Sequence, residues 1–426
     1  MRREGLILPI IVVIIPNHII PGVENSRDHD FTPTPAAEMP RSGGASEFLR
    51  FFKTELLPYI DHRYPANGTH LVHGHSLGGL FLMYALASDP GVFDGYVALE
   101  PAMHWNHRAL DPVFSEKIPG VSGKGKAVFI GGRSGSAYSE MGLDSLESIL
   151  RARASSGLHW KMVAYEDENH NTVKLKGTYD GLRYVYGGYS QDPVEFLPSR
   201  GVLLAGQPFQ VLTSWERPHL HYTSDGSEPG ESSPEVQDGA VPVEDPRKIR
   251  LRLVSNLGVF DRELPLALQA GEAIAPEGEQ VAAPIDGLWH FALCPPEEWP
   301  HLASGHPFAQ GEGAGEINLD TPGRKRFAGK FRRDIEISEE GYYVFGIRGK
   351  GRLSLGSHQI LESDGTPESG WQGYVAPLRS GRYLLTFEVL KEGEDLRPQL
   401  TVMRTTAGQP KWWKSPPWLA LDLMTR

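Results

Sequence analysis

Apolar strand-like runs alternate with helix-like segments over the chain as far as about Tyr189. The strand-like runs are rich in Val, Ile and Leu, as strands buried on both faces are. The helix-like segments carry apolar side chains at intervals of three and four residues. This alternation predicts a parallel sheet wrapped by helices, an α/β domain. The predicted strands are residues 10–15, 69–73, 96–99, 127–130 and 160–165, and the predicted helices are residues 44–60, 79–88 and 143–154.

The pattern changes after Gly187. Short runs with period-two alternation, such as residues 219–222 and 249–253, stand between Gly, Pro, Ser and Asp, and the helical spacing disappears. This pattern is typical of all-β sandwich modules. The predicted organisation is an α/β domain at residues 1–189, a β-sandwich at 190–270, a Pro/Glu/Gly/Ala-rich linker at 271–284, a second β-sandwich at 285–408, and a tail at 409–426 with three tryptophans.

Composition excludes several classes of function. The formal net charge is −11, and Lys and Arg are not clustered, which argues against a nucleic-acid partner. A single cysteine, Cys294, rules out an internal disulfide and a cysteine-based metal site. His, Asp and Glu show no convincing ligand spacing, so the sequence implies no metal and no cofactor.

The N-terminal residues allow two interpretations. Two arginines followed by an apolar run imitate a signal peptide. However, Pro9 interrupts the run, no small-x-small cleavage site follows, and Ile and Val predominate. These features favour a buried core strand at residues 10–15 over a targeting segment. The run is too short to span a bilayer as a helix, so no membrane span is expected.

The strongest motif is Gly74-His75-Ser76-Leu77-Gly78, between a predicted strand and a helix of small residues. A nucleophilic serine on a tight strand-to-helix turn requires glycines two positions before and after it, because side chains there would collide with the backbone. The turn would raise the Ser76 hydroxyl above the carboxyl edge of the sheet. The Leu77 N–H would then face a developing oxyanion.

A serine nucleophile also needs a base and an acid that orients the base. His170 follows the predicted strand at residues 160–165 and is the candidate base. The acid is expected after the strand at residues 127–130, where Glu140 is the nearest carboxylate and Asp144 the next. Glu140, Asp144 and the absence of an acid all remain open.

The serine motif and the candidate base lie within residues 10–186. This segment resembles the putative-esterase family of α/β-hydrolases, which includes feruloyl, acetyl-xylan and siderophore esterases. The resemblance implies Ser76 as nucleophile and His170 as base. Trp105 and His75 are candidate substrate-binding residues, and His75 is the residue directly before the nucleophile. The matching segments are IVVIIPN (11–17), RDHDFTPT (27–34), SGGASEFLRFFKTELLPYIDHRY (42–64), GHSLGGLF (74–81), PGVFDGYVALEPAMHWN (90–106) and DENHNTV (167–173).

Three features depart from the family pattern. Glu100 stands where the family carries a serine, and Ser134 stands where the acid is expected. The family also has several dozen residues before the segment at 11–17, including a strand that supplies the second oxyanion N–H. A chain truncated at its N-terminus, and with it a lost secretion signal, is therefore expected.

The β half has resemblances of its own. Residues 221–229 (HYTSDGSEP) resemble the signature of the β-sandwich at the C-terminus of chitobiases, and residues 287–405 resemble the sandwich of anthrax protective antigen. The second type often binds carbohydrate, so the resemblance implies glycan binding there. Asp364 and Trp371 are candidate contacts, although a core or rim role is favoured for each.

Together these features predict a serine carboxyl-ester hydrolase that forms an acyl-enzyme. Its substrate would be a small-molecule or polysaccharide-linked ester, and the full-length protein would be periplasmic or secreted. Two alternatives stay open. One is a catalytically impaired binding or scaffold protein, and the other is an acyltransferase on the same fold.

Overall fold

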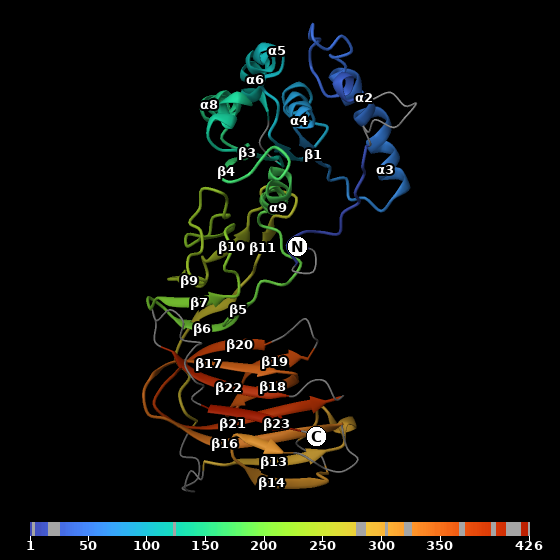
Figure 1. The fold of residues 1–426 in the computed structure, drawn as a ribbon. Coiled ribbons are helices and arrows are strands. Elements are labelled where there is room, and N and C mark those ends of the chain that lie inside the picture. Colours follow the sequence, from blue (N-terminus) through green and yellow to red (C-terminus); the bar gives the residue numbers. More distant parts are fainter. Residues whose placement is uncertain are drawn as a thin grey trace. The chain divides into compact units, whose positions relative to one another are not determined.

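The computed structural model describes residues 1, 5–15, 26–121, 125–277, 287–302, 306–318, 326–365, 371–392, 398–405 and 419–424. The chain forms two compact units. One contains Met1–Asp192 and Leu253–Arg262, and the other contains Pro193–Arg252 and Glu263–Arg426. Figure 1 labels many elements of both, with Met1–Asp192 in blue to green and Leu253–Arg262 in yellow.

The first unit is built on a parallel sheet of four strands whose spatial order is their order in the chain. Each strand pairs with the next in register, so that His75 lies beside Leu99 and Leu99 beside Gly131. All four carboxyl ends therefore lie at one edge of the sheet. The strands are β1 (Leu71–His75), β2 (Gly95–Leu99), β3 (Ala127–Arg133) and β4 (His159–Tyr165).

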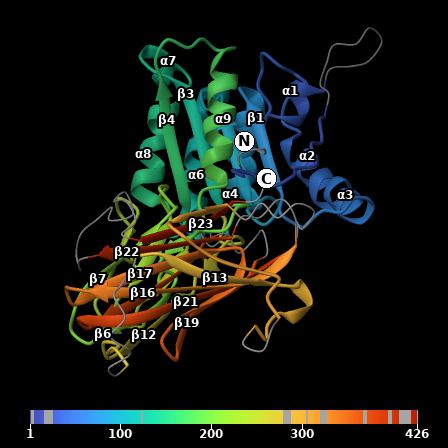
Figure 2. The ribbon, with the colours of Figure 1, turned by 90° about the horizontal axis from the view of Figure 1, so that it is seen from below.

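Helices cover both faces of this sheet. One face of the sheet points into a core that includes the buried residues of α4, α6 and α8; its side chains include those of Tyr96, Ala98, Val128 and Ile130. The alternate strand residues form the other face, which points toward α9. Figure 2 shows α9 and α8 beside the strands. The helical elements are α1 (Arg27–Asp30), α2 (Ala45–Phe51), a π-helical turn (Phe52–Leu56), α3 (Leu57–Arg63), α4 (Leu77–Ser88), α5 (Trp105–Arg108), α6 (Leu110–Lys117), a 3₁₀ turn (Ile118–Gly120), α7 (Ser136–Glu140), α8 (Leu143–Arg153) and α9 (Val173–Val185).

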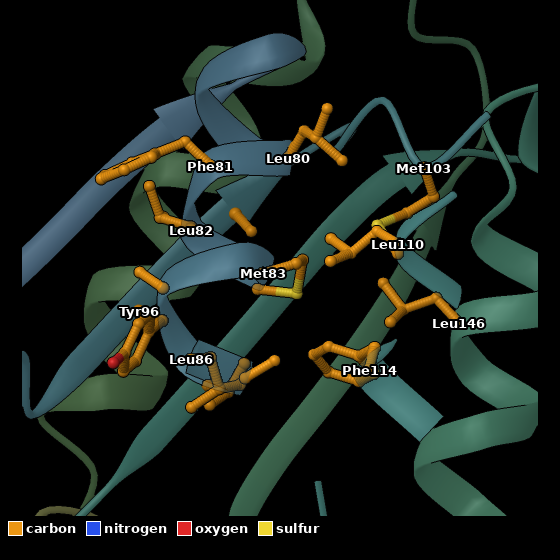
Figure 3. Packing of buried hydrophobic residues seen from close by; sticks show 14 of the residues in the cluster. Leu80, Phe81, Leu82, Met83, Leu86, Tyr96, Met103, Leu110, Phe114 and Leu146 are labelled. Carbon is orange, nitrogen blue, oxygen red and sulfur yellow. The ribbon is translucent and has the colours of Figure 1, made fainter. Parts of the chain in front are cut away.

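Helix α4 is buried on almost every side. It is apolar around its whole circumference, which is the pattern of a helix surrounded by protein. Figure 3 shows Met83 and Leu86 of α4 facing Leu110 and Phe114 of α6, all of them buried. Since the residue before α4 is Ser76, this packing holds the end of the helix that carries the predicted nucleophile.

The predicted parallel α/β fold is confirmed, with one local error. Four of the five predicted strands and all three predicted helices overlap observed elements. Residues 10–15, predicted as a core strand, form no strand, and the side chains of Ile10 to Ile14 are 45–79% exposed. Apolar composition suits a buried strand, but a strand also needs a neighbour for its backbone N–H and C=O groups. The described part of the sheet offers these residues none.

The second unit is all β, as predicted. Two sheets pack their inner faces around one core that includes Trp289, Phe331 and Phe345. A seven-stranded sheet has the order β12-β6-β20-β17-β22-β23-β15, and a six-stranded sheet has the order β14-β13-β16-β21-β18-β19. Two smaller sheets contain β11, β10 and β8, and β5, β7 and β9.

Most strands of this unit are antiparallel and alternate buried with exposed positions, which is why their sequence shows period two. They are β5 (Phe196–Leu197), β6 (Arg200–Leu204), β7 (Phe209–Thr213), β8 (Leu220–Thr223), β9 (Ala240–Val243), β10 (Arg250–Leu253), β11 (Arg262–Glu263), β12 (Ala267–Gly271), β13 (Trp289–Cys294), β14 (Ala309–Gly313), β15 (Glu316–Asn318), β16 (Phe327–Ile337), β17 (Gly341–Arg348), β18 (Lys350–Leu355), β19 (His358–Asp364), β20 (Trp371–Leu378), β21 (Gly381–Lys391), β22 (Gln399–Thr405) and β23 (Leu419–Met424), with a 3₁₀ turn at Pro296–Glu298.

Strands from different predicted modules share a sheet. Strands β6 and β12 come from the range predicted as the first β module, yet β6 pairs with both β12 and β20. Strand β23, from the predicted tail, pairs with β22 and β15. The tryptophan-containing part of the tail and half of the predicted linker (residues 278–284) lie outside the described residues, and the domain boundaries stay a prediction. None of the described helices has the length and apolar composition needed to cross a membrane.

Candidate active site

Ser76 lies at a tight turn between β1 and α4. Its backbone has φ 59° and ψ −119°, a conformation that costs free energy for a residue with a side chain. The Ser76 N–H donates to the Leu99 carbonyl at 2.9 Å. The Ser76 carbonyl accepts from the N–H groups of Leu80 and Ala102, at 3.0 and 3.1 Å. These three hydrogen bonds hold the strained residue at the carboxyl edge of the sheet.

The glycines around Ser76 do not all have the predicted steric role. A Cβ added to Gly74 would lie 2.6 Å from the backbone of Gly78, and one added to Gly79 would lie 2.9 Å from Pro101 Cα. At Gly78 the nearest atom of a neighbouring residue would be in Phe31, at 3.9 Å. The requirement for glycine predicted at position 78 is therefore wrong, since the close approaches occur at positions 74 and 79.

Glu100 reaches the same edge from the neighbouring strand. Because His75 and Leu99 are paired in register, the residues that follow them, Ser76 and Glu100, leave adjacent strands side by side. Glu100 has a φ of 42°, and its N–H donates to the Gly131 carbonyl at 2.7 Å. Its side chain is completely buried.

The buried Glu100 carboxylate joins two basic side chains. Its Oε2 accepts a hydrogen bond from Nδ1 of His170. Its Oε1 accepts from Nε of Arg133 at 2.6 Å and from the Arg133 backbone N–H at 3.1 Å. Burial by itself raises the pKa of the Glu100 carboxyl, but the hydrogen bonds from Arg133 and His170 outweigh it and hold that pKa below its ordinary value of 4.5. Glu100 is thus an ionised carboxylate at neutral pH.

His170 lies in the turn between β4 and α9. The Asn169 side-chain oxygen accepts from the N–H groups of Asn171 and Thr172, at 2.8 and 3.0 Å, which fixes the turn around the histidine. The His170 side chain is 41% exposed, so solvent and small molecules can reach it. With Nδ1 directed at Glu100, its Nε2 is the nitrogen left for another partner.

His75 lies next to this pair. Its ring centroid is 4.4 Å from that of His170, and its Nε2 is buried with no hydrogen-bond partner among the described residues. Burial, together with the nearby His170, lowers the pKa of His75 from 6.5 to about 4. His75 is therefore neutral at neutral pH.

The structure brings together Ser76, Leu77, His75 and His170 of the predicted site, because each adjoins the carboxyl end of a strand or the turn there. Leu77 is the first residue of α4, where backbone N–H groups have no partner within the helix. Trp105 is only 8% exposed, and its ring N–H donates to the Thr34 carbonyl at 3.2 Å. Its place is in the core, and its predicted contact with substrate stays a prediction.

The predicted acid residues lie elsewhere. Glu140 is exposed at the end of α7, and Asp144 on α8 is 3.6 Å from the guanidinium of Arg108. The carboxylate that contacts His170 is that of Glu100. The geometry therefore departs from the prediction of Glu140 as the acid. The available signal was a single charged residue, Glu100, at the end of an otherwise apolar buried strand. The role of Arg133 as its partner had no signal in the sequence.

Ser76, Glu100 and His170 follow the carboxyl ends of β1, β2 and β4, so a serine, a buried carboxylate and a histidine lie at one edge of the sheet. Residues 1–152 match the family described as "Putative esterase". This stretch is similar to esterases.

Curated relatives are similar to part of the chain. The chain is 34% identical over 111 residues to the ferri-bacillibactin esterase BesA of Bacillus subtilis, covering 24% of this chain and 38% of that protein. It is 37% identical over 99 residues to the siderophore triacetylfusarinine C esterase of Aspergillus fumigatus, covering 22% and 34%. The chain thus spans little more than a third of the length of these relatives.

Two solved structures are also similar to this chain. The IroE-like serine hydrolase from Shewanella oneidensis is 27% identical, over 40% of this chain and 59% of that chain, with a TM-score of 0.37. The BES protein from Bacillus cereus is 25% identical, over 39% and 68%, with a TM-score of 0.36.

Proposed function

We propose that the chain is a carboxylic ester hydrolase in which Ser76, His170 and Glu100 form the catalytic triad. The observation that carries this proposal is the hydrogen bond between His170 Nδ1 and the buried Glu100, at the sheet edge where Ser76 occupies its strained turn. A carboxylate on Nδ1 keeps the proton there and leaves Nε2 free to accept the proton of a serine hydroxyl. The similarity to esterases supports the same reaction class.

The reaction proceeds by two acyl transfers. Ser76 Oγ attacks the ester carbonyl while His170 Nε2 takes its proton, and Glu100 stabilises the imidazolium. The Leu77 N–H donates to the oxyanion. The alcohol then leaves with the proton from His170, which leaves an acyl group on Ser76. A water molecule, deprotonated by His170, attacks this acyl-enzyme and releases the carboxylic acid and free Ser76.

Arg133 is a positioning residue in this scheme. It holds Glu100 Oε1 through both its guanidinium and its backbone N–H, so the carboxylate cannot rotate away from His170. Its positive charge also keeps Glu100 ionised in a buried position, where a lone carboxylate would be protonated.

Hydrolysis of short p-nitrophenyl esters tests the reaction. The wild-type protein is expected to release p-nitrophenol and Ser76→Ala to lose this activity, with circular dichroism spectra the same for both. Ser139→Ala, which changes an exposed serine of α7, is the matched control. Equal rates for wild type and Ser76→Ala would refute the proposal.

For the substrate we propose an ester of an iron-chelating siderophore, because the curated relatives are named for such esters. The sequence also predicted polysaccharide-linked esters, with glycan contacts at residues such as Trp371, which is 41% exposed at the start of β20. Purified protein offered ferri-bacillibactin, triacetylfusarinine C and acetylated or feruloylated xylan would separate the two classes by the product released. Hydrolysis of the xylan esters alone would overturn the siderophore assignment.

The remaining alternatives make different predictions. A scaffold protein would leave Ser76 unreactive toward a fluorophosphonate probe, whereas the triad requires rapid labelling. An acyltransferase would form an acylated sugar when a sugar acceptor is present, whereas a hydrolase yields the free acid. We expect labelling and free acid. For the full-length protein we expect a periplasmic or secreted location, which cell fractionation tests.

A further inference from the structure

We propose that His75, Glu100 and His170 also bind a divalent transition-metal ion such as Zn²⁺, and that the bound ion inhibits hydrolysis. One ligand atom from each of these residues lies within 4.8 Å of the other two. The sequence showed no metal-binding pattern because the three residues follow or end three different strands. The fold brings them together at the carboxyl edge of the sheet.

The ligand set suits zinc in type and number. Two imidazoles and one carboxylate are ligands that Zn²⁺ prefers, and three protein ligands leave a fourth position for water. Bonds of about 2.0–2.2 Å to each ligand require Glu100 Oε2 and His170 Nδ1, which share a hydrogen bond, to separate so that the ion can lie between them. Side-chain rotation of His75 and His170 supplies that movement, since His170 is in a turn and is 41% exposed.

His75 supplies a ligand that nothing else in the described structure uses. Its Nε2 is buried, accepts and donates no hydrogen bond, and belongs to a ring 4.4 Å from that of His170. Buried polar atoms without a partner are rare in folded proteins and call for an explanation such as an ion. Occupancy by a metal ion would satisfy this nitrogen.

Glu100 can serve the metal without releasing Arg133. Arg133 holds Oε1, whereas Oε2 faces His170 Nδ1 and is the oxygen available to the ion. The carboxylate stays anchored by the backbone N–H of Arg133 at 3.1 Å. Such anchoring of a ligand by an outer partner is typical of protein metal sites.

Metal binding and catalysis exclude each other at His170. An ion on Nδ1 displaces the proton that this nitrogen donates to Glu100, and the neutral ring then carries its proton on Nε2. Nε2 can no longer accept the Ser76 proton, so acyl transfer stops. The Nδ1–H bond breaks and an Nε2–H bond forms on the same ring, so the number of protons is unchanged, and chelation of the ion restores the original tautomer.

The binding test uses Co²⁺ in place of Zn²⁺. Co²⁺ absorbs visible light when protein side chains coordinate it, whereas Zn²⁺ is spectroscopically silent. Metal-free protein without a polyhistidine tag is titrated with CoCl₂, and bound Co²⁺ is then displaced with ZnCl₂. We expect one equivalent to bind to wild type. His75→Ala and His75→Asn are expected to lower the affinity at least about tenfold, as loss of a ligand requires. Ser76→Ala and the exposed-histidine variant His62→Ala are expected to bind as wild type does.

The inhibition test uses p-nitrophenyl ester hydrolysis, and only this part rests on the proposed function. Zn²⁺ is expected to inhibit wild type and EDTA to restore its rate. Equal Co²⁺ affinity of wild type and both His75 variants, with melting curves showing that the variants fold, would overturn the site. Activation by Zn²⁺ would overturn the inhibitory role. Absence of esterase activity alongside stoichiometric Co²⁺ binding would refute the proposed function and leave the metal site standing.

Discussion

Replacing Glu100 by glutamine distinguishes the acid that we propose, Glu100, from the acid that the sequence predicted, Glu140. Arg133 donates two hydrogen bonds to Oε1, so the amide oxygen of the introduced glutamine would occupy that place. The amide NH₂ would then face His170 Nδ1 and donate to it. Nδ1 would have to accept, and the ring proton would move to Nε2. This is the tautomer that cannot take a proton from Ser76.

The expected loss in kcat is about 10³- to 10⁴-fold with KM little changed, as for other triads whose acid is replaced. The substitution also removes the charge on a fully buried partner of Arg133, which is itself 26% exposed. We expect the free energy of unfolding to fall by about 2 kcal/mol, since the hydrogen bonds remain and only the ion pair is lost. Initial rates with p-nitrophenyl acetate and urea unfolding followed by circular dichroism measure both effects.

Glu140→Gln is the matched control, because it makes the same chemical change at an exposed carboxylate. We expect its kcat to stay within about twofold of wild type and its stability within about 0.5 kcal/mol. The triad assignment would be refuted if Glu100→Gln kept more than about a tenth of the wild-type kcat. It would equally be refuted if Glu140→Gln lost as much activity as Glu100→Gln.

Three further substitutions test the surrounding structure. Gly74→Ala should abolish soluble folded protein or activity, because the added Cβ would lie 2.6 Å from the backbone of Gly78. Gly78→Ala should keep both the folded protein and its activity, since the nearest atom of a neighbouring residue would be 3.9 Å away. Comparable melting temperatures for the two variants would contradict this expectation. The lowered pKa of His75 means that the unfolded chain binds a proton more readily, so stability is full above pH 6.5 and falls as the pH drops toward 4. Because the ring is partly exposed to solvent, we expect a loss of about 1–2 kcal/mol, less than the full pKa shift would give. Urea unfolding across that range should show a shallower loss for His75→Gln, and parallel profiles would argue against it. The double variant Val12→Lys, Ile14→Lys should change the free energy of unfolding by less than about 0.5 kcal/mol, since both side chains are exposed. A loss of several kcal/mol would instead support the buried strand that the sequence predicted at residues 10–15.

The parts of the fold that the sequence predicted are those set by local pattern. Buried parallel strands such as β2 and helices such as α8 are recognisable by composition and periodicity. The elbow at Ser76 was predictable because its motif describes a backbone turn. Residues 10–15 were not, because burial of an apolar run depends on a neighbouring strand that local sequence does not specify.

The acid could not be chosen from the sequence because it depends on register between strands. Glu140 had the expected place in the chain order, but order along the chain does not fix which side chain reaches His170. The pairing of His75 with Leu99 puts Glu100 beside the nucleophile, and that pairing is a property of the folded sheet. Arg133 likewise matters only once β3 lies next to β2.

The strand order β1-β2-β3-β4 has a consequence for how the site forms in time. Each strand joins the one before it in the chain, so the sheet can grow by short-range steps, which favours fast folding. Ser76 and Glu100 would be in place once β1 and β2 pair, whereas His170 arrives only when β4 docks. In refolding from urea we therefore expect esterase activity to return after most helical circular dichroism signal has recovered. Simultaneous recovery of the two signals would show that the sheet closes in one step.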